Sequence, residues 1–303
     1  MKKGKGQTLI PYLFIGPAAV FLVVFITYPL LHSLYLSFTE FNFIYDERPA
    51  FVGLANYIRL FAVDDRFKAA LKNTMLFALL YFVLVVVGSL LIAVLLISRL
   101  RWRDFFQMAV VMPIIVPLSL AGVMFTWIMN PTFGIFNFVM KEYLGMPGMA
   151  RNWLGNPRTA LYVLVLVSLW KFMGFTTIIF LAGLGSIPRD IYEAARIDGA
   201  NWVQELIWVT IPNLKEAFFL ASLYGIIQGI KVYELPYVVT GGGPGTATLT
   251  LYLYIWRAAF GYFDMGLASS VAYVTSALIL MCSGLMLMVT GERGRQVDAQ
   301  KVL

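Results

Sequence analysis

Long apolar runs separated by short polar segments dominate the chain. A helix needs about 20 mainly apolar residues to cross about 30 Å of hydrocarbon. The stretches with this length and polarity lie at about 11–38, 73–98, 105–130, 159–184, 217–239 and 267–290. The pattern therefore predicts an all-α integral membrane protein with six transmembrane helices.

The third predicted span contains Pro113 and Pro117. Each proline removes a backbone donor, so we expect a kink whose freed carbonyl groups are satisfied by neighbouring groups or by water. The sequence leaves two interpretations open. The kink either serves packing alone or helps to open a cavity.

Composition agrees with a membrane protein, because 60% of the residues are hydrophobic and only 13% are charged, against about 25% charged residues in soluble domains. The net charge of +7 comes from basic residues scattered over short loops, which argues against a nucleic-acid partner. Arg99, Arg101 and Arg103 crowd one such loop, and loops of this kind are retained in the cytoplasm. Both terminal tails, 1–10 and 291–303, are therefore predicted to be cytoplasmic.

The predicted spans lack a set of residues suited to catalysis. They hold a single histidine, His32, one glutamate and no aspartate, which excludes a convergent acid–base pair or metal cluster. The lone Cys282 excludes an intramolecular disulfide. The glycine-rich stretch 240–245 lacks the lysine of a phosphate-binding loop and is expected to be a tight turn. We therefore predict a protein that is not an enzyme and binds no cofactor or metal itself.

The segment 186–213 lies in a loop that the same charge argument assigns to the cytoplasm, between the fourth and fifth spans. S-I-P at 186–188 and T-I-P at 210–212 each place proline after a hydroxyl residue, which is typical of helix starts. Asp198-Gly199 predicts a break, because glycine readily adopts the left-handed conformation that ends helices. The first helix combines acidic side chains with small alanines, whereas a helix lying on a bilayer favours a basic face and large apolar residues. We therefore favour a protein-contact surface over an interfacial helix.

This segment resembles the EAA motif of ATP-binding-cassette (ABC) importer permeases. The matching residues are Glu193, Ala194, Ala195, Asp198, Gly199, Ala200 and Pro212. Val209 and Ile211 stand where isoleucine and leucine are usual, which is a conservative change. The stretches 152–161 and 233–245 are similar to the carbohydrate-uptake group of these permeases, the maltose, glycerol-phosphate and multiple-sugar type. The first span resembles the first-named permease of the usual pair.

The resemblance implies a transport subunit of a prokaryotic cell (inner) membrane. In this family two permeases form the pathway, so a second permease subunit is expected, in a heterodimer. Two cytoplasmic subunits carry ATP and Mg and bind the EAA helices, which act as coupling helices. An extracytoplasmic binding protein delivers the solute, here a sugar or sugar-like molecule. From the residues alone, a self-contained secondary transporter or channel remains the alternative, because membrane-embedded Lys and Glu also suit ion-coupled transport.

Three charged residues, Lys171, Lys231 and Glu234, lie within the predicted spans. A charge at the centre of a membrane helix costs about 2.5–3.5 kcal/mol on insertion scales, so such residues usually face a cavity or a partner. Lys231 and Glu234 are three residues apart and either pair on one helix or contact the solute. Together with nearby aromatic and amide side chains, the candidate pathway residues are Trp170, Lys171, Tyr224, Gln228, Lys231, Tyr233 and Glu234.

Overall fold

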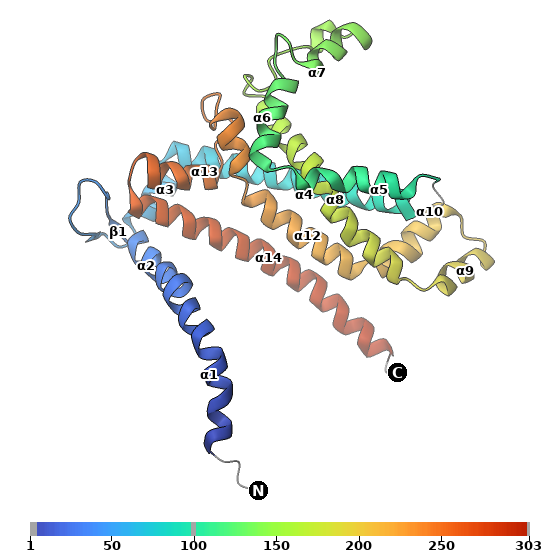
Figure 1. The fold of residues 1–303 in the computed structure, drawn as a ribbon, viewed down its shortest axis with the longest axis horizontal. Helices are drawn as coiled ribbons and strands as arrows, with labels where there is room; N and C mark the ends of the chain where they lie inside the picture. The colour runs from blue at the N-terminus through green and yellow to red at the C-terminus, as the bar shows by residue number, and fades with distance from the viewer. Residues whose placement is uncertain (1–4, 98–100, 302–303) are drawn as a thin grey trace. The chain divides into compact units, whose positions relative to one another are not determined.

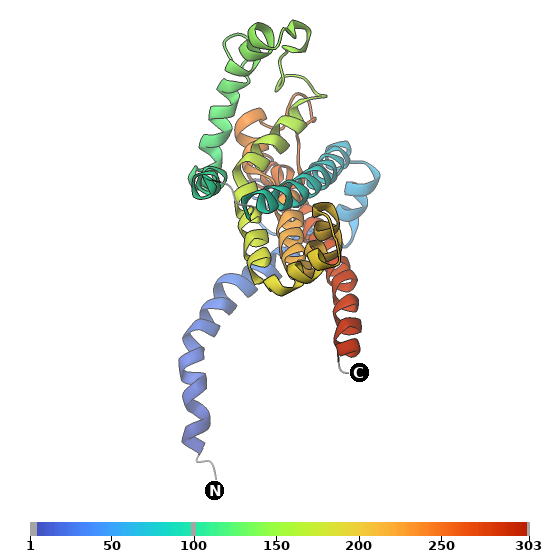
Figure 2. The same cartoon turned by 90° about the vertical axis from the view of Figure 1, so that its right-hand side faces the viewer.

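The chain folds into two compact units in a computed structural model that describes residues 5–97 and 101–301 (Figures 1 and 2). The first unit comprises Met1–Asp64 and Tyr254–Val274, and the second comprises Asp65–Leu253 and Thr275–Leu303. Side chains are described for residues 14–97 and 101–288. Arg99 and the outermost ends of both predicted tails lie outside the described residues.

The first unit begins with an almost continuous helix that includes the candidate span Phe14–Ser37. Its elements in chain order are α1 (Lys5–Leu22), the π-helical η1 (Val23–Thr27), α2 (Tyr28–Ser37), β1 (Thr39–Glu40), β2 (Ala50–Phe51), α3 (Ala55–Ala62), the end of α13 (Leu251–Trp256), η7 (Arg257–Gly261) and the start of α14 (Met265–Lys301). β1 pairs antiparallel with β2. This ladder departs from the all-α prediction, because strands of two residues are too short to show an alternating pattern.

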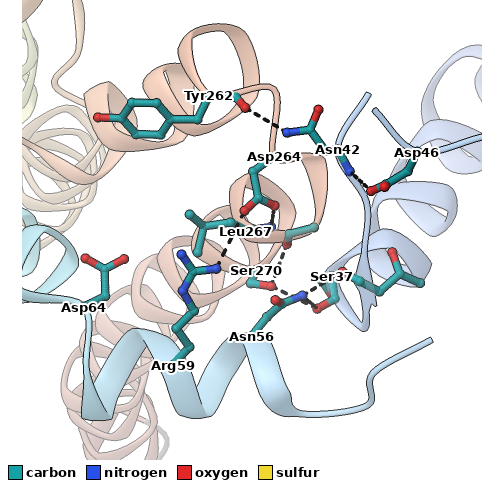
Figure 3. A network of polar contacts seen from close by, with 12 residues as sticks. Ser37, Asn42, Asp46, Asn56, Arg59, Asp64, Tyr262, Asp264, Leu267 and Ser270 are labelled. Carbon is teal, nitrogen blue, oxygen red and sulfur yellow. Dashed lines mark hydrogen bonds and ion pairs between the residues drawn. The ribbon is translucent and has the colours of Figure 1, made fainter. Parts of the chain in front are cut away.

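A buried polar cluster connects the end of α2 with α3 and the start of α14 (Figure 3). The Asn56 amide donates to the carbonyl oxygens of Ser37 at 3.1 Å and Thr39 at 2.8 Å. The Ser270 hydroxyl donates to the same Ser37 carbonyl at 2.9 Å. Gly266 approaches Thr39 so closely that a β-carbon there would lie 2.1 Å from the carbonyl oxygen. The cluster thus satisfies the Ser37 carbonyl, which α2 leaves free at its end, and the Thr39 carbonyl of β1.

Asn56→Ala is expected to lower the free energy of unfolding by about 1–3 kcal/mol, because two buried carbonyl groups lose a donor. The control is Arg59→Ala on the same helix. The Arg59 side chain is 59% exposed and its ion pair with Asp264 is long, at 3.8 Å, so its loss is expected to cost less than about 1 kcal/mol. Thermal unfolding in detergent, followed by circular dichroism, checks the contrast. Equal effects of the two substitutions would contradict it.

The second unit is built around three long helices. Its elements in chain order are α4 (Asp65–Ile97), α5 (Arg103–Val111), the 3-10 segment η2 (Met112–Ile115), α6 (Leu118–Ile128), α7 (Ile135–Phe138), η3 (Val139–Tyr143), η4 (Pro147–Met149), α8 (Ala160–Ser186), α9 (Arg189–Ile197), α10 (Trp202–Gln204), η5 (Glu205–Thr210), α11 (Ile211–Asn213), α12 (Lys215–Ile230), η6 (Pro236–Thr240), the start of α13 and the end of α14. α4, α8 and α12 contact one another and bury Tyr81 and Phe180. A β-carbon on Gly229 would lie 2.8 Å from the Ala78 α-carbon, as expected where small residues let membrane helices approach closely.

Several helices are long and apolar enough to cross a membrane. Among the described residues these are Phe14–Ser37, Asp65–Ile97, Ala160–Ser186 and Met265–Met288. Two bent helix pairs add to them only if each pair is one span: Arg103–Ile115 with Leu118–Ile128, and Trp202–Asn213 with Lys215–Ile230. The described part of the chain allows up to six spans, and the six-span count stays a prediction.

The third predicted span is broken at its prolines. η2 ends at Ile115, Val116 is extended, and α6 begins at Leu118. The two helical arms differ in direction by 104° (Figure 1). The kink predicted from Pro113 and Pro117 is confirmed.

The predicted fifth span is wrong in its second half. α12 ends at Ile230, and helical structure resumes only at Glu234. Pro236 lacks the N–H that would bond the Val232 carbonyl in a continuous helix, and the Thr250 hydroxyl donates to that carbonyl instead at 2.8 Å. Lys231 and Glu234 therefore do not lie on one helix. The tight turn expected at 240–245 follows η6, with Gly241, Gly242 and Gly245 at positive φ.

Candidate functional site

A cavity of about 440 Å³ lies in the second unit, where α4, α8 and the end of α12 meet the start of α6. Its lining includes five of the predicted pathway residues, Lys171, Gln228, Lys231, Tyr233 and Glu234. Residues from the broken end of α12 and from α8 thus converge on one space, although about sixty positions separate them in the sequence.

Two predicted pathway residues do not line the cavity. The Trp170 ring packs edge-on against Phe125, with ring centroids 5.4 Å apart. The Tyr224 ring packs against Phe175 at 4.7 Å. In this structure both rings contribute to contacts between helices.

The sequence analysis missed the other lining residues, Phe77, Tyr81, Leu118, Ser168, Phe172 and Val232. Phe77 and Tyr81 are four residues apart on α4, and their rings stack at 6.0 Å. That spacing was visible in the sequence, but nothing there showed which neighbour the pair would face. The Tyr81 hydroxyl is buried and finds no hydrogen-bond partner in the part of the chain that the structure describes.

Two of the three charges at the cavity bond backbone groups of the broken third span. The Lys171 ammonium donates to the carbonyl oxygens of Ile114, at 3.1 Å, and Val116. The Glu234 carboxylate accepts the backbone N–H of Ser119 at 2.9 Å. Buried charges that are paired or hydrogen-bonded in this way avoid most of their desolvation cost.

Lys231 differs from these two charges. It is exposed at the cavity, directly after the last residue of α12. Its ammonium forms no ion pair with Glu234 or with any other residue in the described ranges. Pairing on one helix, one of the two sequence-based interpretations, is therefore wrong, because α12 ends at Ile230, before both residues, and helical structure resumes only at Glu234.

The segment 186–213 forms the predicted helix, turn and helix, at the far end of α8 (Figure 1). α9 ends in a Schellman motif: Gly199 has φ +81°, its N–H donates to Arg196 O at 3.1 Å, and the Ala200 N–H donates to Ala195 O at 2.9 Å. Ser186 does not act as the predicted cap, because its hydroxyl donates back to the Gly183 carbonyl at 2.7 Å. The end of α9 is nevertheless sharply defined by these backbone hydrogen bonds.

The second helical part of the segment braces α9. The Arg196 guanidinium donates twice to the Glu205 carboxylate, at 2.7 and 3.3 Å, and this hydrogen bonding raises the pKa of Arg196. The hydroxyl groups of Tyr192 and Thr210 lie 3.1 Å apart. Thr210 also fails as a predicted cap, because its hydroxyl donates to the Glu205 carbonyl at 3.2 Å. These contacts link α9 to the segment that leads into α12.

The side chains of α9 that the motif singles out face outward. Glu193, Ala194, Asp198 and Gly199 are exposed, and Ala195 is half-buried. Ile197 is 86% exposed. The outer face of α9 thus carries acidic, small and apolar side chains together.

A family model described as the binding-protein-dependent transport system inner membrane component matches residues 98–291, which is more than half of the chain. The chain belongs to this family. The matched region contains α9, the broken third span and most of the cavity, whereas Phe77 and Tyr81 precede it. The permease is thus a multi-pass membrane protein whose family region carries both candidate sites.

Full-length relatives agree with this assignment. The permease is 34% identical to a probable ABC transporter permease protein, YurN, of Bacillus subtilis, over 91% of this chain and 94% of the relative. It is also 34% identical to the trehalose/maltose transport system permease protein MalF of Thermococcus litoralis, over 89% of each chain. A solved bacterial alginate ABC transporter in complex with an alginate pentasaccharide-bound periplasmic protein shares the fold, with TM-score 0.80, 18% identity and 96% of each chain covered. The predicted ABC permease of the carbohydrate-uptake group is confirmed.

Proposed function

We propose that the chain forms, with a second permease subunit, the pathway for a sugar or sugar-like solute across a prokaryotic inner membrane. An extracytoplasmic binding protein delivers the solute, and two cytoplasmic partner subunits drive the cycle by hydrolysing Mg-bound ATP. The observation that carries the proposal is α9, an exposed and braced helix between α8 and the segment that leads into α12. The named relatives support this function, because one is a trehalose/maltose permease and another transports alginate.

α9 is proposed to be the contact for an ATP-binding subunit. Ala194 and Ala195 permit close approach to the helix backbone, and Glu193 offers a polar anchor. A membrane surface is a poorer partner, because α9 lacks the excess of basic side chains that anionic lipid headgroups attract: Asp190 and Glu193 offset Arg189 and Arg196. The exposed Ile197 adds apolar area that association with a protein would remove from water.

α9 is connected closely to predicted membrane-spanning helices at both of its ends. At one end only Ile187 and Pro188 separate it from α8. At the other, the Arg196–Glu205 pair and the Tyr192–Thr210 contact tie it to η5, which runs into α11 and α12. Displacement of α9 by closing ATPase subunits therefore moves α8 and α12, and these helices carry the cavity walls.

The cavity is proposed to be part of the solute pathway. Its volume of about 440 Å³ falls within the 300–1,000 Å³ typical of small-molecule sites. Gln228, Lys231 and Tyr233 supply hydrogen-bonding groups beside the aromatic rings of Phe77 and Tyr81. Such a mixture suits hydroxyl-rich solutes, whose polar groups need partners and whose ring faces need apolar contact.

The proposal is tested by reconstituting the permease into liposomes, alone and with its copurifying subunits, and measuring uptake of radiolabelled sugars. We expect uptake only with the ATP-binding subunits, the binding protein and ATP present. A Walker-lysine substitution in the ATP-binding subunit serves as the control and should abolish uptake. Accumulation by the chain alone under a proton or sodium gradient would instead establish a secondary transporter.

A further inference from the structure

The break between η2 and α6 frees backbone groups that a continuous helix would pair. The helical ladder is interrupted between Ile115 and Leu118, and neither Pro113 nor Pro117 has an N–H to donate. In a membrane interior each unsatisfied backbone group costs several kcal/mol. The bend is therefore stable only where other groups replace the lost partners.

The first arm of the break, made of α5 and η2, is held by α8. The Lys171 ammonium bonds the carbonyl oxygens of Ile114, near the end of this arm, and of Val116, just beyond it. Three residues further along α8, a β-carbon on Gly174 would lie 2.3 Å from the Val110 carbonyl oxygen. A close backbone contact and a charged hydrogen-bond donor thus attach this arm to the fourth span.

The second arm, α6, is held by the segment that follows α12. Glu234 accepts the N–H of Ser119, in the first turn of α6, at 2.9 Å. One turn later, a β-carbon on Gly122 would lie 2.9 Å from Val239 Cγ2 and 3.3 Å from Leu235 Cδ2. The two arms are therefore attached to different elements, each by one charged side chain and one glycine contact.

The signs of the two charges match the ends that they bond. The first arm ends in free carbonyl groups, which favour a cation, and α6 begins with free N–H groups, which favour an anion. Lys171 is only 6% exposed and its ammonium lies 5.4 Å from the centroid of the Phe172 ring. The hydrogen bonds of the Lys171 ammonium go to backbone carbonyl groups at the break of the third span.

We infer that Lys171 and Glu234 form a polar clasp that sets the bend of the third span and thereby positions the cavity wall, and that neither residue binds the solute. Leu118, the first residue of α6, lines the cavity, so a change in the bend moves that wall directly. The clasp also links α8 to η6 through the two arms. This inference concerns the bend itself and holds whatever solute or energy source the permease uses.

The test measures the distance between spin labels on the two arms, in the full chain reconstituted in lipid with its copurifying subunits. Cysteines replace Met108 on α5 and Trp127 on α6, which are 64% and 65% exposed, and Cys282→Ser removes the native thiol. We expect a narrow distance distribution in this background. Lys171→Met and Glu234→Leu, which remove the donor and the acceptor, are each expected to broaden and shift it.

Matched variants separate the clasp from general damage. Glu234→Gln keeps an acceptor oxygen and Lys171→Arg keeps at least two donors, so both are expected to retain the narrow distribution. Lys231 is the third charged residue of the same cavity and bonds neither arm. Lys231→Met is therefore expected to leave the distance between the spin labels unchanged. Uptake kinetics provide the second measurement, with kcat expected to fall in Lys171→Met and Glu234→Leu more than KM rises.

Two results would overturn the inference. One is an unchanged distance distribution in Lys171→Met and Glu234→Leu together with a raised KM, which would make these side chains solute contacts. The other is a broadened distance distribution in Glu234→Gln, which would show that the hydrogen bond to Ser119 does not hold α6. If the apolar variants fail to insert into the membrane, the distance distribution of Glu234→Gln serves as the test of the inference. Absence of ATP-driven uptake would count against the proposed function and leave the distance measurement intact.

Discussion

Gly199→Pro is expected to lower ATP-driven solute uptake at least about tenfold, because proline cannot form the turn that ends α9. Gly199 has φ +81°, whereas the proline ring holds φ near −65°. The substitution also removes the N–H that donates to Arg196 O. The native turn at the end of α9 is therefore expected to be lost.

The matched control is Gly199→Asn, because asparagine tolerates the left-handed conformation better than other side chains. We expect uptake close to that of the unchanged permease. Copurification of the ATP-binding subunits and their ATPase rate are measured beside uptake in both variants. Continued ATP hydrolysis with little uptake in Gly199→Pro would demonstrate uncoupling, and full uptake would refute the role of α9.

Gly174→Ala is expected to lower the stability of the permease by about 3 kcal/mol, the upper end of the usual range for overpacking. A β-carbon at this position would lie 2.3 Å from the Val110 carbonyl oxygen and 2.7 Å from the Val111 α-carbon. Both obstacles belong to the backbone, so rotation of a side chain cannot relieve the clash. The helix α5 must move away from α8, or the bend of the third span must change.

Gly185→Ala provides the control within the same helix. A β-carbon on Gly185 would meet nothing within 4 Å, and alanine is preferred over glycine in helices by up to about 1 kcal/mol. We expect this variant to be as stable as the unchanged chain or slightly more stable. Thermal unfolding of both variants in detergent checks the difference, and a similar loss of stability in the two would refute the close contact.

Much of the helical architecture was predictable from local patterns. Apolar runs placed the helices, Pro113 and Pro117 placed the break in the third span, and Asp198-Gly199 placed the end of α9. The end of α12 at Ile230 was not predicted: Pro236 was a local signal for a break, but the group that replaces its missing N–H at the Val232 carbonyl, the Thr250 hydroxyl, lies 18 residues further along the chain. Local preference decides a helix end only where no distant group offers the backbone a better partner.

The candidate site was predictable in its residue types but not in their roles. Burial cost singled out Lys171, Lys231 and Glu234, and the structure places all three at one cavity. The same cost is met equally by a solute, by an ion pair or by backbone groups, so the sequence had no means to choose among them. The backbone partners became evident only when the break of the third span was seen beside α8 and Glu234.

The sequence by itself determined that the chain enters a membrane, that its helices break at particular prolines and glycines, and that it carries the EAA segment, because apolar length, missing N–H groups and positive φ are local properties. Only the tertiary structure decided that Lys171 and Glu234 bond the broken span while Lys231 remains exposed at the cavity. A charged side chain bonds whichever complementary group the packing brings within about 3 Å. Which group comes within this distance depends on how whole helices pack against one another, and no local sequence pattern shows that packing.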